Sequence, residues 1–303
     1  MAAKTWSTPY WPEGVSHDVA DYAKPLFSVL DESAQAYPNL VYTIFNDATR
    51  TFAQVKDTAD RVASFLVSRG IKKGDRVAIF LPNLPHYPAI FFGILKAGAV
   101  CVTCNPLYTA NELNYQLNDA GAKVVFCMDH PQFYPTTVAA VKDSSVESVV
   151  ICSVKSYLPK VKALVGGLLG KIPKAQHHEA GHLFFDDVVA SAQPRPPAVE
   201  INPAEDLALI IYTGGTTGVP KGAALTHTNF TYDLEASNEW IRLVHEPGAK
   251  PEKARKGGFH TYLGVLPWYH SFGMTCALLS ACSSASKLIC VPDPRAGNPP
   301  FTE

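Results

Sequence analysis

Glycines, hydroxyl groups and one lysine are concentrated in the run Tyr212–Gly222, which reads YTGGTTGVPKG. Glycines allow backbone N–H groups to approach an anion, threonine hydroxyl groups add hydrogen-bond donors, and a lysine adds a mobile positive charge. The apolar run Leu207–Ile211 lies directly before this run and predicts a short buried strand. A strand that ends in such a loop indicates a binding site for a polyphosphate.

The spacing within this run excludes two common kinds of phosphate loop. A P-loop ends in Gly-Lys-Ser/Thr, but here Lys221 follows Pro220 and precedes Gly222. A dinucleotide-binding Gly-x-Gly-x-x-Gly turn does not fit either, because Gly214 and Gly215 are adjacent. The alternative of an ordinary glycine-rich surface turn stays open at this point.

A second run contains residues that could take part in a reaction. It spans Gly264–Met274 and pairs a predicted strand with an aromatic turn around His270. A lone histidine among aromatic residues is commonly a hydrogen-bonded core residue. The functional interpretation is that His270 forms a wall between an apolar pocket and a reacting carboxylate. The run alone leaves both interpretations open.

The zinc-peptidase pattern His-Glu-x-x-His begins at His178. Its chemistry needs His178 and His182 on one face of a stable helix, with Glu179 activating a zinc-bound water. Pro173 closes the segment on one side and Gly181 interrupts it, so a helix here would be very short. We therefore expect a polar surface loop and no metal ligands, and keep a zinc-dependent hydrolase as a remote alternative.

A single Cys-x-x-Cys pair, Cys101 and Cys104, lies inside a predicted strand. Residues at odd spacing on a strand point to opposite faces, so the two sulfur atoms cannot hold one metal ion together. We interpret both as buried structural thiols.

Composition limits the class of protein. With 303 residues, 47% of them hydrophobic, the chain can bury one large core or two modest cores. A formal net charge of -1 gives no broad basic surface for nucleic acid. Residues 1–22 lack the apolar core typical of a signal peptide, and no run approaches the about 20 apolar residues of a membrane span. Seven cysteines without regular spacing indicate a reduced, cytoplasmic setting, and a peroxisomal location or peripheral membrane contact stays open.

Helix and strand signals alternate between Thr51 and Cys152. The pairs Thr51 with Gln54 and Thr109 with Glu112 form capping boxes that predict the starts of two helices. Four apolar runs predict buried strands, at Val77–Leu81, Val100–Cys104, Lys123–Cys127 and Ser148–Cys152. This alternation predicts an α/β fold of doubly wound, mostly parallel sheets with flanking helices. Such folds bind ligands where the strands end, which is where the phosphate-binding run lies.

Apolar residues also recur at helical spacing between residues 161 and 172, and lysines flank them. The pattern is compatible with a helix that lies on a membrane surface. Gly166, Gly167 and Gly170 each weaken a helix by about 1 kcal/mol relative to alanine, so we expect core packing or a surface loop instead. The lysines are Lys160, Lys162, Lys171 and Lys174.

Three blocks in order resemble the adenylate-forming (AMP-binding) superfamily. Tyr212–Gly222 resembles its phosphate-binding signature, Leu95–Val100 with Asn105–Thr109 resembles an upstream core motif, and Leu266–Met274 resembles the acyl-pocket motif that follows. The pairing of the first and third blocks is most similar to long-chain fatty acyl-CoA synthetases and 4-coumarate-CoA ligases. The resemblance covers most of the chain from Thr51 onward.

The resemblance implies an acid–thiol ligase that uses ATP with Mg²⁺, forms an acyl-adenylate and transfers the acyl group to coenzyme A. Lys221 and His270 would be the catalytic residues, with His270 beside the substrate carboxylate. The acyl pocket would be shaped by Phe272, Gly273 and Met274. The phosphates would be held by Thr213, Gly214, Gly215, Thr216, Thr217, Gly218 and Lys221.

The resemblance also implies a division of the chain. We expect an N-terminal segment (1–50), a first α/β subdomain (51–190) and the start of a second one with the phosphate loop (191–303). The chain ends at Glu303, before the family's adenine- and ribose-binding motifs and the lid domain with its catalytic lysine. We therefore expect an N-terminal fragment that is inactive by itself. A noncatalytic nucleotide-binding or regulatory fragment is the alternative.

Overall fold

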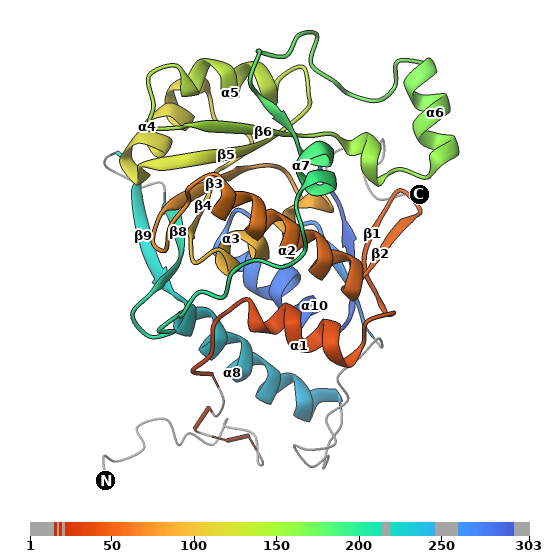
Figure 1. Ribbon diagram of the computed structural model, residues 1–303. Coiled ribbons are helices and arrows are strands. Elements are labelled where there is room, and N and C mark those ends of the chain that lie inside the picture. Colours follow the sequence, from red (N-terminus) through yellow and green to blue (C-terminus); the bar gives the residue numbers. More distant parts are fainter. Residues whose placement is uncertain (1–14, 17, 20–21, 214–218, 246–259, 294–303) are drawn as a thin grey trace.

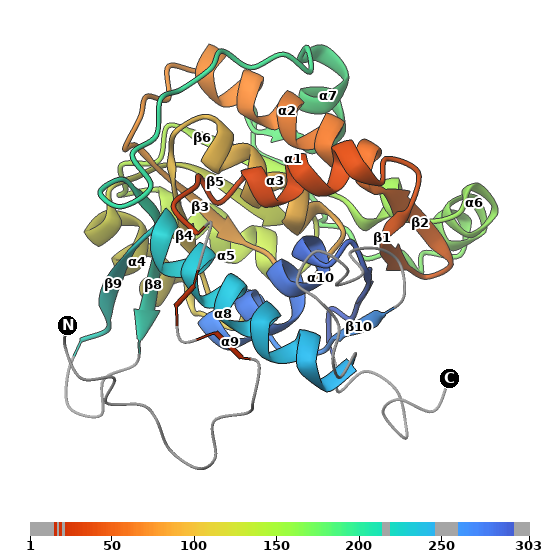
Figure 2. The same cartoon turned by 90° about the horizontal axis from the view of Figure 1, so that it is seen from below.

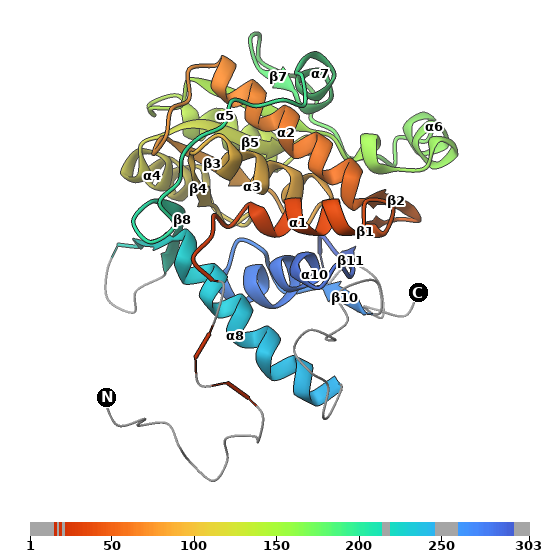
Figure 3. The same ribbon diagram turned by 60° about the horizontal axis from the view of Figure 1, so that its bottom comes forward.

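The computed structural model describes residues 15–16, 18–19, 22–213, 219–245 and 260–293 (Figure 1). These residues form two β-sheets with helices packed around them. Figure 3 shows the helix α8 (His227–His245) extending from the edge of the larger sheet past α10 (Ser280–Ser283).

The larger sheet has seven strands in the order β7-β6-β5-β3-β4-β8-β9. Neighbouring strands pair in parallel except for β8 and β9, which are antiparallel. This topology confirms the predicted doubly wound, mostly parallel sheet. The strands are β3 (Arg76–Phe80), β4 (Val100–Thr103), β5 (Ala122–Met128), β6 (Ser148–Cys152), β7 (Leu183–Phe184), β8 (Leu207–Thr213) and β9 (Lys221–Thr226).

Helices cover both faces of this sheet (Figure 1). On one face, α2 (Phe52–Ser68), α3 (His86–Lys96) and α7 (Phe185–Ser191) enclose the main core, which includes Val77 and Ile79 of β3. On the other face, α4 (Ala110–Ala120) and α5 (Phe133–Val141) enclose a second core with Ala78 and Phe80 of β3. Alternate residues of one strand thus enter opposite cores, as the two-residue period of a strand requires.

Both predicted capping boxes are present. The Thr51 side chain accepts a hydrogen bond from the Gln54 backbone N–H, and the Gln54 side chain accepts one from the Thr51 N–H. Thr109 and Glu112 make the same reciprocal pair at the start of α4. Helix α4 ends at Gly121, whose φ of 63° lies in the left-handed region that favours glycine.

The smaller sheet joins the two ends of the described chain. Its strand order is β10-β11-β1-β2, so β1 from the N-terminal part pairs in parallel with β11. Figure 2 shows this sheet near α10 and α1 (Ser28–Ala36). The strands are β1 (Val41–Phe45), β2 (Ala48–Thr51), β10 (Thr261–Gly264) and β11 (Lys287–Cys290). The smaller sheet can form only when these segments, which are far apart in the sequence, are brought together by the fold.

The division of the chain near residue 190 stays a prediction. Strands β8 and β9 follow that point in sequence, yet they complete the same sheet as β3 to β7. The sheet is thus continuous across the predicted boundary. The proline-rich stretch that suggested it, around Pro194 and Pro196, runs as an irregular connection between α7 and β8.

One helix departs from expectation. Helix α6 (Lys160–Leu168) has no buried residue, and its large apolar side chains face solvent. Of the two expected alternatives, core packing is wrong for residues 160–168, and a surface loop is wrong as well, because these residues form a helix at the surface; Ile172, beyond the helix, packs against the main core. The physical reason is that the partly buried side of the helix carries the small residues Ala163 and Gly166, which leave the bulky residues facing outward.

Three helices are joined by a buried ion cluster. Lys96 of α3 lies 2.5 Å from a carboxylate oxygen of Asp31 in α1 and 2.5 Å from one of Asp60 in α2. Lys56 is the outer member of the cluster and lies 2.6 Å from the other Asp60 oxygen. The Lys96 and Asp60 side chains are only 7% and 8% exposed, so the cluster couples α1, α2 and α3 inside the molecule.

Candidate functional site

The candidate site lies at the carboxyl edge of the seven-stranded sheet. There β8 ends at Thr213 and β9 begins at Lys221. The predicted phosphate-binding residues between them, Gly214, Gly215, Thr216, Thr217 and Gly218, lie outside the described residues. The two predicted site residues that flank them are described, and both are exposed at this edge.

The strand register brings these two residues together. Thr213 and Lys221 are direct partners in the antiparallel pairing of β8 with β9. A hydroxyl group and an ammonium group therefore stand side by side at the start and end of the predicted phosphate loop. Both groups donate hydrogen bonds, which suits an anionic ligand.

Strands β8 and β9 pack closely against each other at Gly222. An added Cβ at Gly222 would lie 2.7 Å from the Ile210 side chain and 3.1 Å from the Tyr212 ring, so glycine is the residue that fits. The Tyr212 hydroxyl donates to the Asp119 carboxylate at 2.5 Å, which ties β8 to α4. Burial, followed by the hydrogen bond to Asp119, raises the pKa of Tyr212 and keeps it a neutral donor.

His270 is exposed, so the interpretation as a core histidine is wrong. Its backbone is extended, and its ring Nδ1 accepts a hydrogen bond of 3.3 Å from the Phe272 N–H at the start of α9 (Ser271–Gly273). That bond orients the ring and leaves Nε2 free of this contact. The side chain is thereby presented at the surface of the turn instead of being packed beneath it.

The other predicted substrate-facing residues occupy different environments. Phe272 is 57% exposed, whereas Met274 is fully buried in the main core. An added Cβ at Gly273 would lie 2.2 Å from the Pro267 carbonyl oxygen, so only glycine fits there. Their predicted role in an acyl pocket stays a prediction.

Asn83 is a site residue that the sequence analysis missed. It is 4% exposed and follows β3, and its side-chain NH₂ donates to the carbonyl oxygens of Gly264 and Leu266, both at 2.8 Å. Its side-chain oxygen accepts from the Trp268 N–H at 2.9 Å. The sequence offered one signal for this role, an amide side chain after a predicted strand. Its hydrogen-bond partners lie far along the chain, so the sequence could not identify them.

Two further bonds hold the same turn, one against the end of β4 and one against α3. The Thr103 hydroxyl at the end of β4 donates to the Tyr269 carbonyl oxygen at 2.8 Å, and the Tyr87 hydroxyl donates to the Trp268 carbonyl oxygen at 3.3 Å. Thr103 also pairs with Ile211 of β8, two residues before Thr213. The turn that carries His270 is therefore fixed beside the strand that leads into the predicted phosphate loop.

A cavity of about 520 Å³ opens at this edge. Most of its lining comes from the ends of β3, β4, β5, β10 and β11 and the segments after them, so the carboxyl ends of both sheets meet there, and Pro173 joins from the connection after α6. The lining is largely apolar, with Leu107, Phe133 and Val265, and it includes Asn83 and Tyr269. A largely apolar cavity with a few polar groups in its lining can hold an apolar ligand.

The zinc-like pattern does not form a metal site. Residues 178–182 adopt a loop and a turn instead of a helix. His178 Nε2 lies 3.0 Å from an Asp129 oxygen, while His182 Nδ1 lies 2.8 Å from the Tyr134 hydroxyl, so the two histidines have separate partners. Within the described ranges, no three His, Cys, Asp or Glu side chains are grouped so that they could hold a metal ion.

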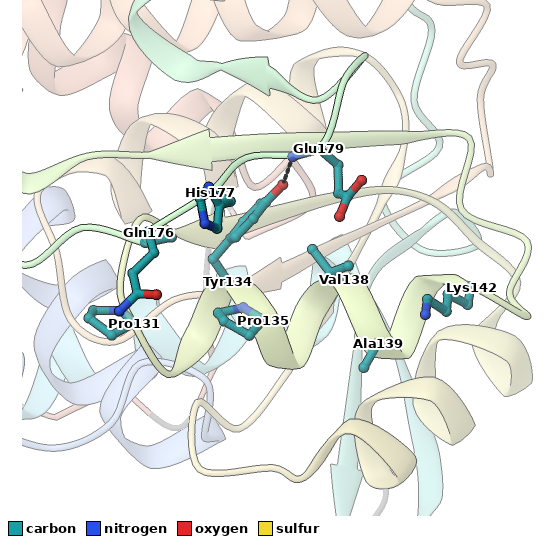
Figure 4. Close-up of a pocket in the computed structure, with 10 residues that line it drawn as sticks. Pro131, Tyr134, Pro135, Val138, Ala139, Lys142, Gln176, His177 and Glu179 are labelled. Atoms are coloured by element: carbon teal, nitrogen blue, oxygen red, sulfur yellow. Dashed lines mark hydrogen bonds between the residues drawn. The ribbon is translucent and has the colours of Figure 1, made fainter.

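A pocket of about 440 Å³ lies between this loop and α5 (Figure 4). Tyr134 crosses it, and its hydroxyl accepts a hydrogen bond of 2.7 Å from the Glu179 N–H. The pocket shares no lining residue with the cavity at the sheet edge. The histidine-rich loop therefore belongs to a structural contact on α5 and not to the candidate site.

The cysteine pair follows its prediction. Cys101 packs in the main core and Cys104 in the second core, on opposite faces of β4. Burial raises the pKa of both thiols, which keeps them protonated. In the part of the chain that the structure describes, no helix combines the length and apolarity needed to cross a bilayer.

Comparison with known proteins identifies the family. A long-chain-fatty-acid–CoA ligase of Bacillus subtilis (strain 168) is 33% identical over 302 residues, which covers 96% of this chain and 50% of the relative. The ligase of the same name from Salmonella typhimurium (strain LT2) is 31% identical over 297 residues, with coverage of 96% and 51%. The chain spans about half the length of the curated relatives it matches.

Solved structures agree with this relationship at the level of the fold. The long-chain-fatty-acid–CoA ligase FadD1 of Archaeoglobus fulgidus superposes with a TM-score of 0.69 at 23% identity, covering 94% of this chain and 50% of that one. The model of the AMP-binding enzyme family matches residues 30–302, which include both strands of the phosphate-loop hairpin and the His270 turn. The chain therefore belongs to the AMP-binding enzyme family.

Proposed function

We propose that this chain supplies the triphosphate-binding and acid-facing part of an ATP-dependent acyl-CoA ligase that acts on fatty acids. The observation that carries the proposal is the position of three groups at one sheet edge. Thr213 and Lys221 are paired across the hairpin, and the His270 turn is bonded to the adjacent strand β4. This arrangement supports an anion site next to a site for a second substrate.

In the proposed reaction, a carboxylate oxygen attacks the α-phosphorus of ATP, and the bond to the β-phosphate bridging oxygen breaks. The products are an acyl-adenylate and pyrophosphate. The thiol of coenzyme A then attacks the acyl carbonyl carbon and AMP leaves, giving a thioester. Such transfers depend mainly on positioning and on stabilisation of developing negative charge.

Lys221 and Thr213 would act on the β- and γ-phosphates. The ammonium group would neutralise charge that accumulates on the leaving pyrophosphate, and the hydroxyl group would donate a hydrogen bond. The resemblance assigns the same task to the residues of the loop between them, Gly214, Gly215, Thr216, Thr217 and Gly218.

His270 would orient the acid. Its Nδ1 accepts the Phe272 N–H, so in the neutral ring the proton lies on Nε2, from which it can donate to a carboxylate oxygen. The largely apolar lining of the cavity of about 520 Å³ supports an apolar acyl group. The predicted contacts of Phe272, Gly273 and Met274 with that group belong to this proposal.

Mg²⁺ would enter with the ATP phosphates, where it would neutralise charge on the phosphate oxygens. Over the described ranges, no group of three acidic, histidine or cysteine side chains is arranged to hold it. We therefore assign no step of the reaction to a protein-bound metal ion.

Two measurements on the purified chain test this proposal. In the first, ATP binding is followed by titration calorimetry. In the second, ATP–pyrophosphate exchange is assayed with a panel of fatty and aromatic acids. We expect ATP binding without exchange, since the chain spans about half the length of its relatives. Robust exchange would contradict inactivity of the isolated chain, and absence of ATP binding would contradict the proposed phosphate site.

The alternative of a noncatalytic nucleotide-binding fragment predicts the same binding result. Full-length relatives distinguish the two: transplanting residues 30–302 of this chain into the B. subtilis ligase tests whether this half supports acyl-CoA formation. Acyl-CoA formation by the folded chimera would support the ligase proposal. A folded chimera that binds ATP but forms no acyl-CoA would support the noncatalytic alternative.

A further inference from the structure

Helix α6 presents a row of large apolar side chains to solvent. Val161, Leu164, Val165 and Leu168 recur at the spacing of one helical face, and their exposure is 73%, 65%, 46% and 80%. Leu169, just beyond the helix end, is 62% exposed. Figures 1 and 2 both place α6 at the periphery of the molecule. Contiguous apolar exposure of this kind marks an interaction surface.

The orientation of α6 is the reverse of a helix that packs into a core. Its partly buried side carries Ala163 and Gly166, and an added Cβ at Gly166 would lie 3.1 Å from Ile172. The small residues thus allow close contact with the body of the protein. The bulky residues are left exposed, and Leu164 and Leu168 also line the groove between α6 and the body of the protein.

Lysines border the apolar face on both sides. At about 100° per residue, Lys160 and Lys162 fall at the two edges of the arc formed by the apolar residues. Lys171 and Lys174 follow on the same connection, and all four lysines are exposed. The acidic group in contact with them is Asp47, which pairs with Lys162 at 2.5 Å.

From this geometry we infer that α6 is an interfacial helix that docks on an anionic lipid surface. Apolar side chains would enter the region between headgroups and acyl chains, and lysines at the rim would extend their charged ends to anionic headgroups. A second copy of the chain fits less well, because a symmetric pair of these faces would bring like-charged lysine rims together.

The position of α6 relates this surface to the candidate site. Pro173 lines the groove beneath α6 and also the cavity at the sheet edge. The groove beneath α6 and that cavity are therefore neighbours that meet at Pro173. The docking surface itself does not depend on the proposed function.

Sedimentation with lipid vesicles tests the inference on the full chain. We expect binding to phosphatidylcholine vesicles that contain phosphatidylserine, and weaker binding to phosphatidylcholine alone. The double variant Leu164→Ser/Leu168→Ser should weaken binding about tenfold or more, because it removes apolar insertion. The variant Lys160→Gln/Lys171→Gln should also weaken it about tenfold and reduce its salt dependence. The matched control is Lys72→Gln, which replaces an exposed lysine after the C-terminal end of α2. This variant should bind like the wild type.

Folding and self-association are measured on the same variants. Because Leu164 and Leu168 are exposed, their serine variant should keep the urea midpoint and the ATP affinity of the wild type. Equal binding of wild type and both variants to anionic vesicles would overturn the inference, as would absence of vesicle binding. A dimer in light scattering that the leucine variant abolishes would assign the face to a second copy and would also overturn it.

Discussion

At the level of single residues, the amide of Asn83 holds the turn that leads to His270. It makes three hydrogen bonds to that turn, two as donor and one as acceptor. The bonds to Gly264 and Trp268 are buried and the bond to Leu266 is partly buried, so loss of the amide leaves buried polar groups without a partner. The exposed His270 ring is therefore carried by a turn that Asn83 fixes to the end of β3.

We expect Asn83→Ala to lower the free energy of unfolding by about 2–4 kcal/mol, because it leaves buried carbonyl and N–H groups without partners. Urea unfolding of the purified variant measures this loss. Asn111→Ala, which removes an exposed asparagine from α4, is the matched control and should stay within about 0.5 kcal/mol of the wild type. Equal stabilities of the two variants would show that the Asn83 bonds contribute nothing.

Hydrogen bonds between residues close in sequence could be predicted from the sequence, whereas hydrogen bonds between residues far apart in sequence could not. The capping boxes at Thr51 and Thr109 join residues three positions apart, so their patterns were sufficient. The partners of Asn83 lie 181 or more positions away. The exposure of His270 likewise depends on how its turn packs, which explains why the local run left its role open.

At the level of elements, the ion cluster of Lys96, Asp31 and Asp60 connects α1, α2 and α3. We expect Lys96→Met to cost about 3 kcal/mol or more, because it leaves the buried Asp60 carboxylate with only its outer partner. Lys56→Met removes that outer partner, whose side chain is 38% exposed, and should cost less than about 1 kcal/mol.

Thermal and urea unfolding of the two methionine variants gives a direct comparison, since both replace a lysine that contacts Asp60. A loss for Lys96→Met no greater than that for Lys56→Met would mean that the buried position carries no extra stabilisation. Methionine retains most of the apolar volume of the lysine stem, so both variants report mainly the loss of the charge.

The elements themselves were well predicted where hydrophobic period and caps agree. Strand β6 occupies the predicted range, and α4 ends at the predicted glycine. Helix α6 was the exception: its period was read correctly, but the expectation of core packing or a surface loop was wrong, since the residues form an exposed helix. A periodic pattern specifies which residues share a face, and it does not specify whether the rest of the chain covers that face.

At the level of the whole molecule, His227 joins the N-terminal part to the start of α8. Its Nδ1 accepts a hydrogen bond of 3.0 Å from the Leu26 N–H. Burial lowers the pKa of His227 to about 4, with the Asp206 carboxylate opposing that shift and Lys73 adding to it. Protonation of Nδ1 would remove the acceptor, so this contact requires the neutral ring.

Because the folded pKa of His227 lies below its unfolded value of about 6.5, its contribution is fully present above that pH and is lost as the pH falls toward 4. We expect this one group to reduce the free energy of unfolding by about 2 kcal/mol between pH 6.5 and pH 5. Burial also lowers the pKa of His86, to about 3, which adds to the loss in the same range.

Urea unfolding at pH 7, 6 and 5 checks this dependence. His227→Gln should flatten the pH slope by about one proton, while His177→Gln, at an exposed loop position, should leave the slope unchanged. An unchanged slope for His227→Gln would contradict the assignment.

The alternating pattern predicted the larger sheet, but the smaller one pairs β1 with β11 across most of the chain, beyond the range of local signals.

The central claim is that the β8–β9 hairpin binds the phosphates of ATP. Titration calorimetry of the chain with Mg-ATP and with AMP tests it most directly, using the wild type, Lys221→Ala and the control Lys72→Ala. We predict that the wild type binds ATP at least about tenfold more tightly than AMP, and that Lys221→Ala loses most of this preference whereas Lys72→Ala keeps it. Equal affinities for ATP and AMP, or a preference unchanged by Lys221→Ala, would contradict the claim.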